Sequence, residues 1–402
     1  MSILSKHNAV RAAHDELRSA GRDPFSVRFE SILSATTGML DGRQVLLLGT
    51  NNYLGLTFDA ECVGSAVAAT RALGTGTTGS RVANGSYASH SELERRLAQF
   101  YGRRHAMVFS TGYQANLGTI SALTGREDVI LFDADSHASI YDACKLTGAE
   151  VIRFRHNDPA DLERRLQRLQ GRKGDVLVIV EGIYSMLGDR APLREIADVT
   201  HAAGAYLLVD EAHSLGVLGD RGRGQAEAAG INADIIVGTF SKSLGSVGGF
   251  CVSDIDGFEV MRLVSRPYMF TASLPPSVVA SVTSALDQVV ARPELRARVL
   301  GNGEQLYRSL VRVGFALGPE PGPIVSVRLP SVEVAVRFWN LVLEAGVYVN
   351  LALPPATPTG DPLLRASVSA AHRPEDIEHA AATITAIGRD LGVIPRTGVV
   401  AA

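Results

Sequence analysis

The segment Tyr206-Leu207-Leu208-Val209-Asp210-Glu211-Ala212-His213 joins a short apolar run to three titratable side chains. A second segment, Ile235-Ile236-Val237-Gly238-Thr239-Phe240-Ser241-Lys242, has the same form. Short, continuously apolar runs between helical patterns are typical of strands buried on both faces of a parallel sheet. Ligands of such sheets bind at the carboxyl ends of the strands. The polar residues that follow these two runs are therefore candidate site residues.

The same alternation of apolar runs and helical patterns extends over much of the chain. It predicts a large α/β domain with helices on both faces of a mainly parallel sheet. After Pro275-Pro276 the pattern changes to a long helical stretch and then to strands near 324–329 and 364–368, which predicts a smaller α+β domain. We expect an N-terminal helical segment over residues 1–45, the α/β domain over 46–285 and the α+β domain over 286–402.

The composition excludes several classes of function. The 402 residues carry a formal net charge of −3 and no run of Lys and Arg, which argues against a nucleic-acid partner. No stretch approaches the roughly 18 apolar residues of a membrane span. The three cysteines are far apart and no His cluster has metal spacing, so neither a disulfide framework nor a metal site is expected. These features favour a reducing cytoplasm.

The two apolar runs end in residues suited to an aromatic, charged cofactor. A carboxylate such as Asp210 is costly at the end of a buried strand unless a charge meets it, and a protonated pyridine nitrogen would do so. His213 could donate to a phenolic oxygen of that cofactor. Lys242 could form an imine while Thr239 and Ser241 bind a phosphate. The alternative for Asp210 is a helix N-cap.

Two further strand ends carry candidate residues. Gly112, in Ser110-Thr111-Gly112-Tyr113, lies where a strand meets a helix, and a helix N-terminus is an anion site that glycine leaves open. His137 could stack on a pyridine ring or could cap a helix.

The segment 74–79 matches the dinucleotide fingerprint Gly-x-Gly-x-x-Gly. That fingerprint requires a strand directly before it, but the residues that precede this segment have a helical pattern. We therefore reject dinucleotide binding.

Together these motifs resemble fold-type I pyridoxal-phosphate enzymes, which have the aspartate aminotransferase-like fold. The longer strings resemble the α-oxoamine synthases, and within that family they are most similar to the bacterial serine palmitoyltransferases. The strings are Phe109-Ser110-Thr111-Gly112-Tyr113, Asp133-Ala134-Asp135-Ser136-His137-Ala138-Ser139-Ile140-Tyr141-Asp142, Glu181-Gly182-Ile183-Tyr184-Ser185-Met186-Leu187-Gly188-Asp189, Val209-Asp210-Glu211-Ala212-His213-Ser214, Gly238-Thr239-Phe240-Ser241-Lys242-Ser243, Arg266-Pro267-Tyr268-Met269-Phe270-Thr271-Ala272-Ser273-Leu274-Pro275-Pro276 and Tyr348-Val349-Asn350 before Pro354-Pro355-Ala356-Thr357-Pro358. The resemblance covers almost the entire chain.

The resemblance implies a role for each matching residue. Lys242 would bind pyridoxal 5′-phosphate covalently, Asp210 would pair with its ring nitrogen, and His137 would stack on its ring. Asn52 and Arg365 would face the amino-acid substrate. Thr271 would reach the phosphate from the neighbouring subunit of a homodimer. The other cofactor-binding residues would be Gly112, Tyr113, Ser185, His213, Thr239 and Ser241.

The activity implied is condensation of an amino acid, L-serine above all, with a long-chain acyl thioester of the palmitoyl-coenzyme A type. Carbon dioxide is lost and a product such as 3-ketosphinganine, a sphingolipid precursor, is formed; the acyl carrier is coenzyme A or a carrier protein. Leu353 departs from the subgroup, which has arginine before the Pro-Pro-Ala-Thr-Pro loop. The alternatives are a synthase for alanine or glycine, such as 8-amino-7-oxononanoate synthase, an aminotransferase, or a non-catalytic cofactor-binding regulator.

Overall fold

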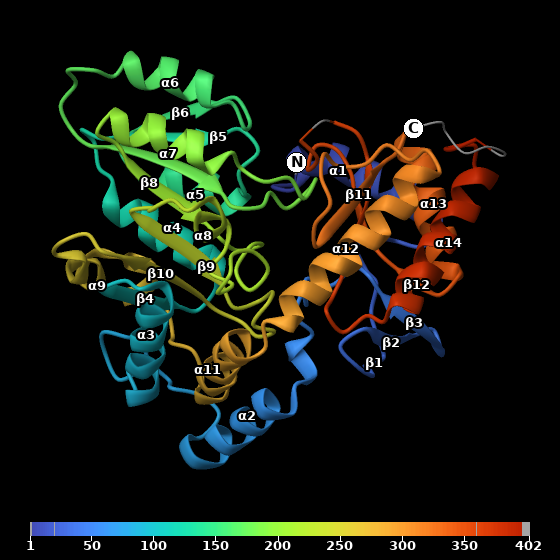
Figure 1. The fold of residues 1–402 in the computed structure, drawn as a ribbon, viewed down its shortest axis with the longest axis horizontal. Helices are drawn as coiled ribbons and strands as arrows, with labels where there is room; N and C mark the ends of the chain where they lie inside the picture. The colour runs from blue at the N-terminus through green and yellow to red at the C-terminus, as the bar shows by residue number, and fades with distance from the viewer. Residues whose placement is uncertain (1, 20, 359, 396–402) are drawn as a thin grey trace. The chain divides into compact units, whose positions relative to one another are not determined.

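The computed structural model describes residues 2–19, 21–358 and 360–395 (Figure 1). Its contacts divide the chain into two compact units. The larger unit is formed by Asn52–Ser185 and Asp189–Ala297. The smaller unit is formed by Met1–Asn51, Met186–Gly188 and Arg298–Ala402, although its first residue and last seven residues lie outside the described part of the chain.

A mainly parallel sheet forms the centre of the larger unit. Its described strands have the order β4-β10-β9-β8-β7-β5-β6, and the five from β9 to β6 run parallel. Only β10 is antiparallel to its neighbours, β9 and β4. The strands are β4 (His105–Phe109), β5 (Val129–Asp133), β6 (Glu150–Phe154), β7 (Val176–Glu181), β8 (Tyr206–Asp210), β9 (Ile235–Thr239) and β10 (Gly249–Ser253). The predicted α/β fold class is confirmed.

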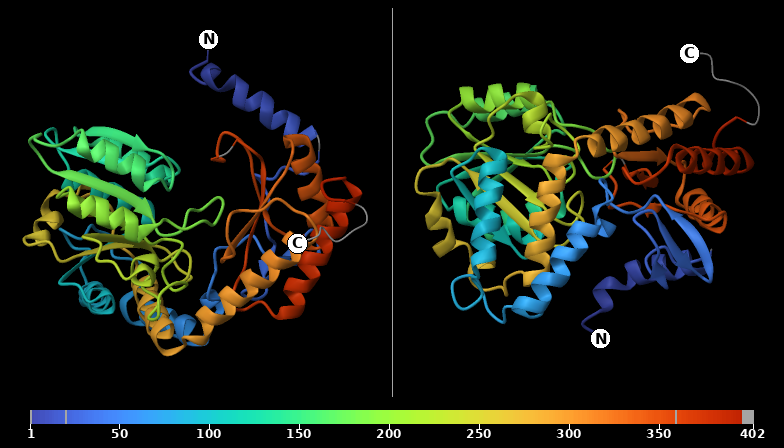
Figure 2. Two further views of the ribbon diagram at one scale, coloured as in Figure 1. Left: turned by 45° about the horizontal axis from the view of Figure 1, so that its top comes forward. Right: turned by 60° about the horizontal axis from the view of Figure 1, so that its bottom comes forward.

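The burial of the strands explains why their sequences are continuously apolar. Every residue of β5, β9 and β10 is buried, so each of these strands is covered on both faces. The helices that flank the sheet in Figures 1 and 2 supply that cover. The helices of the larger unit are α2 (Ala60–Leu73), which packs against α11 and not against the sheet, α3 (Ala88–Tyr101), α4 (Gly112–Leu123), α5 (Ala138–Leu146), α6 (Pro159–Gln167), α7 (Leu193–Ala202), α8 (Gln225–Ala229), α9 (Met261–Val264), α10 (Arg266–Met269) and α11 (Pro276–Ala291).

Two small sheets form the smaller unit. In the first, of order β1-β2-β3-β12, only β12 pairs in parallel; the second, of order β11-β14-β13, is antiparallel. The strands are β1 (Ser31–Ile32), β2 (Thr37–Leu40), β3 (Arg43–Leu47), β11 (Ile324–Arg328), β12 (Val347–Tyr348), β13 (Asn350–Ala352) and β14 (Leu363–Ser367). The segment 1–45, for which the sequence predicts only helix, thus also contains strands.

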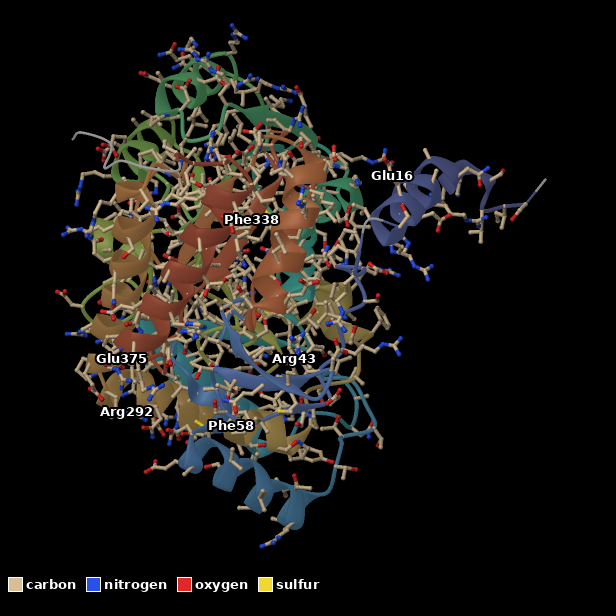
Figure 3. All side chains as sticks on the ribbon, turned by 90° about the vertical axis from the view of Figure 1, so that its right-hand side faces the viewer. Glu16, Arg43, Phe58, Arg292, Phe338 and Glu375 are labelled. Atoms are coloured by element: carbon tan, nitrogen blue, oxygen red, sulfur yellow. The ribbon has the colours of Figure 1, made fainter. Side chains whose placement is uncertain are left out.

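The helices of the smaller unit differ widely in burial. Phe338, labelled in Figure 3, and Trp339 are buried side chains of α13 (Val332–Glu344). By contrast, none of the residues of α1 (Asn8–Ser19) is buried. The remaining helices are α12 (Glu294–Arg312), which crosses the boundary between the units, and α14 (Pro374–Asp390). Among the described residues, no helix combines the length and apolar character needed to cross a membrane.

Candidate active site

A cavity of about 300 Å³ lies in the larger unit, where β7, β8 and β9 end. This is the edge of the sheet at which a parallel α/β architecture binds ligands. Eight of the twelve predicted site residues line the cavity. They are Gly112, Tyr113, His137, Asp210, His213, Thr239, Ser241 and Lys242.

Asp210 is the last residue of β8 and is buried. Its Oδ1 accepts a hydrogen bond of 2.9 Å from the backbone N–H of Ala212, and its Oδ2 accepts one of 2.7 Å from Nδ2 of Asn116. Both oxygens therefore act as acceptors, as expected of a carboxylate. Asn116, which was not among the predicted site residues, therefore contacts one of them.

The residues after β9 form a hydroxyl-lined turn in front of Lys242. Thr239 Oγ1 donates to the carbonyl of Gly248 at 2.9 Å and lies 2.8 Å from Oγ of Ser241. The N–H of Ser241 in turn donates to Thr239 Oγ1 at 3.2 Å. Gly248 has a φ of +129°, a backbone conformation that favours glycine. These contacts present two hydroxyl groups and the Lys242 side chain to one cavity.

The N-terminus of α4 faces the same hydroxyl groups. Thr111 caps this helix by accepting a 3.0 Å hydrogen bond from the N–H of Gln114. A Cβ atom at Gly112 would lie only 2.8 Å from Cβ and Oγ1 of Thr239. The absence of a Cβ at Gly112 therefore lets Thr239 lie against the first turn of the helix, so that its hydroxyl group and the N–H groups of the helix N-terminus face one cavity. The position is suited to a phosphate.

His137 and Tyr113 lie on one side of the cavity. Their rings are 6.2 Å apart and nearly perpendicular. His137 is the N-cap of α5, and its Nδ1 accepts a 3.2 Å hydrogen bond from the N–H of Ser139. Desolvation lowers the pKa of His137; the charge of Asp210 acts against this effect and that of Lys242 adds to it. The helix-capping role and a place in the cavity are therefore compatible for this histidine.

Two residues that the sequence did not predict contact the predicted site residues; Glu181 lines the cavity and Tyr53 does not. Glu181 ends β7 beside Asp210 on β8, and it accepts a hydrogen bond from the backbone N–H of His137. Burial, and then the charge of Asp210, raise the pKa of Glu181 well above its ordinary value. Tyr53 lies behind the cavity, where its hydroxyl group is 2.6 Å from Nδ1 of His213. Glu181 ends an apolar strand as Asp210 does, so its position in the sequence could have predicted it as a site residue.

The imidazole of His156 lies between two carboxylates and connects the turn that contains His137 to another segment of the larger unit. His156 Nδ1 lies 2.7 Å from Oδ1 of Asp133, and its Nε2 lies 2.7 Å from Oδ2 of Asp189. Burial alone would lower the pKa of His156, but the hydrogen bonds to the two carboxylates raise it to about 10. The imidazole is therefore cationic at neutral pH. It joins the start of the His137 turn to the segment that follows Ser185.

Two predicted cofactor-binding residues of the larger unit do not line the cavity. Ser185 lies at the end of its segment in that unit, and its side chain or backbone takes part in an interaction. Thr271 Oγ1 accepts a 3.3 Å hydrogen bond from Nε2 of Gln114, and Thr271 lines a separate, much smaller cavity. Thr271 is therefore not among the residues that line the larger cavity.

The predicted substrate-binding residues belong to different units. Asn52, in the larger unit, is buried and donates from Nδ2 to Oγ1 of Thr57 at 2.7 Å. Arg365 is a buried residue of β14 in the smaller unit, where it donates to Oγ of Ser367 at 3.1 Å and to Oδ1 of Asn51 at 3.3 Å. Asn51 was not predicted. Leu353, also in the smaller unit, directly follows β13 and is half-buried.

The larger unit's cavity fits the donor and acceptor pattern of pyridoxal phosphate. Asp210 offers a carboxylate to a protonated ring nitrogen, and His213 offers an imidazole to a phenolic oxygen. The N–H groups of the α4 N-terminus and the Ser241 hydroxyl can donate to a phosphate, and the absence of a Cβ at Gly112 lets Thr239 lie beside them. Lys242 supplies the amine that an aldehyde requires.

Comparison with known proteins gives a consistent family relationship. The family model described as aminotransferase class I and II matches residues 43–384. A serine palmitoyltransferase of Caulobacter vibrioides (strain NA1000 / CB15N) is 60% identical over 396 residues, which is 98% of each chain. The solved structure of the Sphingomonas wittichii serine palmitoyltransferase is 49% identical, with a TM-score of 0.96 over 98% of this chain and 100% of that one. A variant of the S. paucimobilis serine palmitoyltransferase, solved with a bound PLP–myriocin aldimine, is 47% identical, with the same TM-score and coverage. The chain belongs to the aminotransferase class I and II family.

Proposed function

We propose that this protein is a pyridoxal-phosphate-dependent acyltransferase. It condenses L-serine with a long-chain acyl thioester, releases carbon dioxide and forms a 3-keto amino alcohol such as 3-ketosphinganine. The observation that carries this proposal is the meeting of Asp210, Lys242 and His137 in one cavity at the ends of parallel strands. The similarity to serine palmitoyltransferases supports the choice of substrates.

The predicted residues of the cavity have distinct tasks in this proposal. Pyridoxal phosphate supplies an electron sink for a carbanion at the α-carbon of the amino acid. Asp210 holds a proton at the ring nitrogen, and the Nζ amine of Lys242 takes the α-proton from the substrate. His137 stacks on the ring and donates from its imidazole to the substrate. The N–H groups of α4 and the hydroxyls of Thr239 and Ser241 hold the phosphate.

The amino-acid carboxylate requires a cation. Arg365 is the candidate, because hydrogen bonds to Asn51 and Ser367 hold its guanidinium group in a defined orientation. The carboxylate oxygens would receive charged hydrogen bonds from this group. Leu353 cannot contribute such bonds. We therefore propose that Arg365 carries most of the binding of the serine carboxylate.

We also propose that the enzyme is a homodimer in which Thr271 serves the partner's phosphate site. Thr271 does not line the cavity of its own subunit. Large apolar side chains are exposed in the segment that precedes it, including Phe270 at 70% and Leu263 at 67%. An exposed apolar surface of this kind is typical of an interface.

We propose a cytoplasmic location for the protein, which fits the three free, buried cysteines.

The test is product identification by mass spectrometry. The protein loaded with pyridoxal phosphate is incubated with serine, alanine or glycine, and with palmitoyl-coenzyme A or a palmitoylated carrier protein. Serine and a palmitoyl thioester should give 3-ketosphinganine and carbon dioxide. A product from alanine or glycine alone would replace the serine assignment with another α-oxoamine synthase. A keto acid formed without thioester consumption would indicate an aminotransferase.

Borohydride reduction tests the role of Lys242 separately. The chain has four lysines, so peptide mapping after reduction distinguishes Lys242 from Lys6, Lys145 and Lys173. Lys242→Ala should abolish both the cofactor tag and turnover. Lys145→Ala is the matched control, because this side chain is 73% exposed and, within the described part of the chain, forms its ion pair with nearby Asp142. A tag on any other lysine would contradict the assignment.

A further inference from the structure

A chain of hydrogen bonds connects His137 to Asp210 through two residues that have no role in the proposal above. Nδ1 of His137 lies 2.8 Å from Oγ of Ser139. The same Oγ lies 3.0 Å from Nδ2 of Asn116, which donates to Oδ2 of Asp210 at 2.7 Å. Asn116 and Ser139 are both almost completely buried, so water does not compete for these bonds.

The chemistry of the groups sets the direction of each bond. The two hydrogens of the Asn116 amide are used by Asp210 and Ser139. The reversed amide would place a carbonyl oxygen against the Asp210 carboxylate, which is repulsive. Since Ser139 Oγ accepts from Asn116, its own hydrogen is available to donate to Nδ1 of His137. The backbone N–H of Ser139 also donates to Nδ1, at 3.2 Å.

We propose that Asn116 and Ser139 are positioning residues that keep the ring proton of His137 on Nε2 and hold Asp210 in place. This inference rests on the proposed function. Nδ1 accepts two hydrogen bonds, so the neutral ring carries its proton on the other nitrogen. Among the described residues, none forms a hydrogen bond with Nε2, and His137 lines the cavity. The imidazole thus offers an N–H donor to a carboxylate or carbonyl oxygen of the substrate.

The same bonds favour the neutral form of His137. Protonation of Nδ1 would break both of them, so they oppose it. The other groups that act on this ring are the charges of Asp210 and Lys242, the Glu181 carboxyl that binds its backbone N–H, and the ring of Tyr113. None of these groups donates to Nδ1. The contribution of the Ser139 hydroxyl can therefore be isolated by removing it.

The test is nitrogen NMR of ¹⁵N-histidine-labelled protein loaded with pyridoxal phosphate, without substrate. A His137→Asn spectrum identifies the signal among the ten histidines. Wild type should show the Nε2–H tautomer. Ser139→Ala should raise the pKa of His137 by about 0.7 pH units, the size of one lost hydrogen bond. Asn116→Leu should raise it by less, since Ser139 is then free to accept as well as donate.

Ser136→Ala is the matched control. Its Oγ is buried next to His137 in the sequence and has no hydrogen-bond partner among the described residues, so its removal should leave the pKa unchanged. An Nδ1–H tautomer in wild type would overturn the inference. Equal pKa values of His137 in Ser139→Ala and wild type would also overturn it. If the pKa of His137 were unchanged in Asn116→Leu, Asn116 would not be a positioning residue. The NMR result stands whether or not serine is the substrate, so failure of the proposed function is seen separately in the product assay.

Discussion

Replacing His156 by glutamine should destabilise the protein in a pH-dependent way. The imidazole lies 2.7 Å from a carboxylate oxygen of Asp133 and 2.7 Å from one of Asp189. The side chains of these aspartates are only 0% and 7% exposed. Glutamine can still donate one hydrogen bond, but it carries no charge. Two buried carboxylates would then face each other without a cation between them.

The expected loss of stability is about 3 kcal/mol. Removing one partner of a buried ion pair costs roughly 3–5 kcal/mol, and the 26% exposure of the His156 side chain favours the lower end. The native pKa of about 10 lies above the ordinary 6.5, so the stabilisation is complete below pH 6.5 and is lost as the pH rises through 10. The difference between wild type and variant should therefore shrink as the pH increases over that interval.

Urea unfolding followed by far-UV circular dichroism, at several pH values between 6 and about 10, measures this difference. His201→Gln is the matched control, because His201 forms a single, partly exposed pair with Asp234 at 3.2 Å. Loss of such a pair costs up to about 1 kcal/mol. If His156→Gln unfolded at the same urea concentration as wild type near pH 6, the reasoning about the buried carboxylates would be refuted.

Three further predictions test the site. Asp210→Asn should retain cofactor but lose most turnover, because a neutral amide cannot hold the ring nitrogen's proton; near-normal turnover would remove this role. Gly112→Ala should weaken cofactor binding roughly tenfold, since its Cβ would lie 2.8 Å from side-chain atoms across the cavity, whereas Gly64→Ala, with no atom within 4 Å, should not. In serine titrations followed by cofactor absorbance, Arg365→Ala should weaken binding by about tenfold to a hundredfold and Leu353→Arg should tighten it. A wild type that responds to alanine or glycine but not to serine would contradict the serine assignment.

Much of the cavity could be predicted because it is built at strand ends. An apolar run that ends at Asp210 or shortly before Lys242 predicts the carboxyl end of a strand. It therefore also predicts the edge of the sheet at which the following residues lie. Parallel strands bring their carboxyl ends to one edge, so residues far apart in sequence meet there. Gly112 and His137 were found by the same rule. The antiparallel strand β10 was not predicted, although its five residues are all buried.

The residues that orient the site were not predictable in the same way. Asn116 lies inside α4, where an asparagine has no distinguishing pattern, and its bond to Asp210 spans 94 residues of sequence. Tyr53 and His213 are separated by 160 residues. Such pairs depend on how a helix or loop packs against the sheet edge. The predicted domain boundaries stay a prediction, and so do the roles assigned to the individual site residues.

The amino-acid sequence by itself determined the α/β class, the sheet edge that carries the site and the chemical types of its groups. Those features follow from local apolar periodicity and from the residues that interrupt it, which are written in consecutive positions. Only the tertiary structure decided which nitrogen of His137 accepts a hydrogen bond and which carboxylates enclose His156. Hydrogen bonds and ion pairs act over about 3 Å, and which groups come within that distance is set by packing between elements that are remote in sequence.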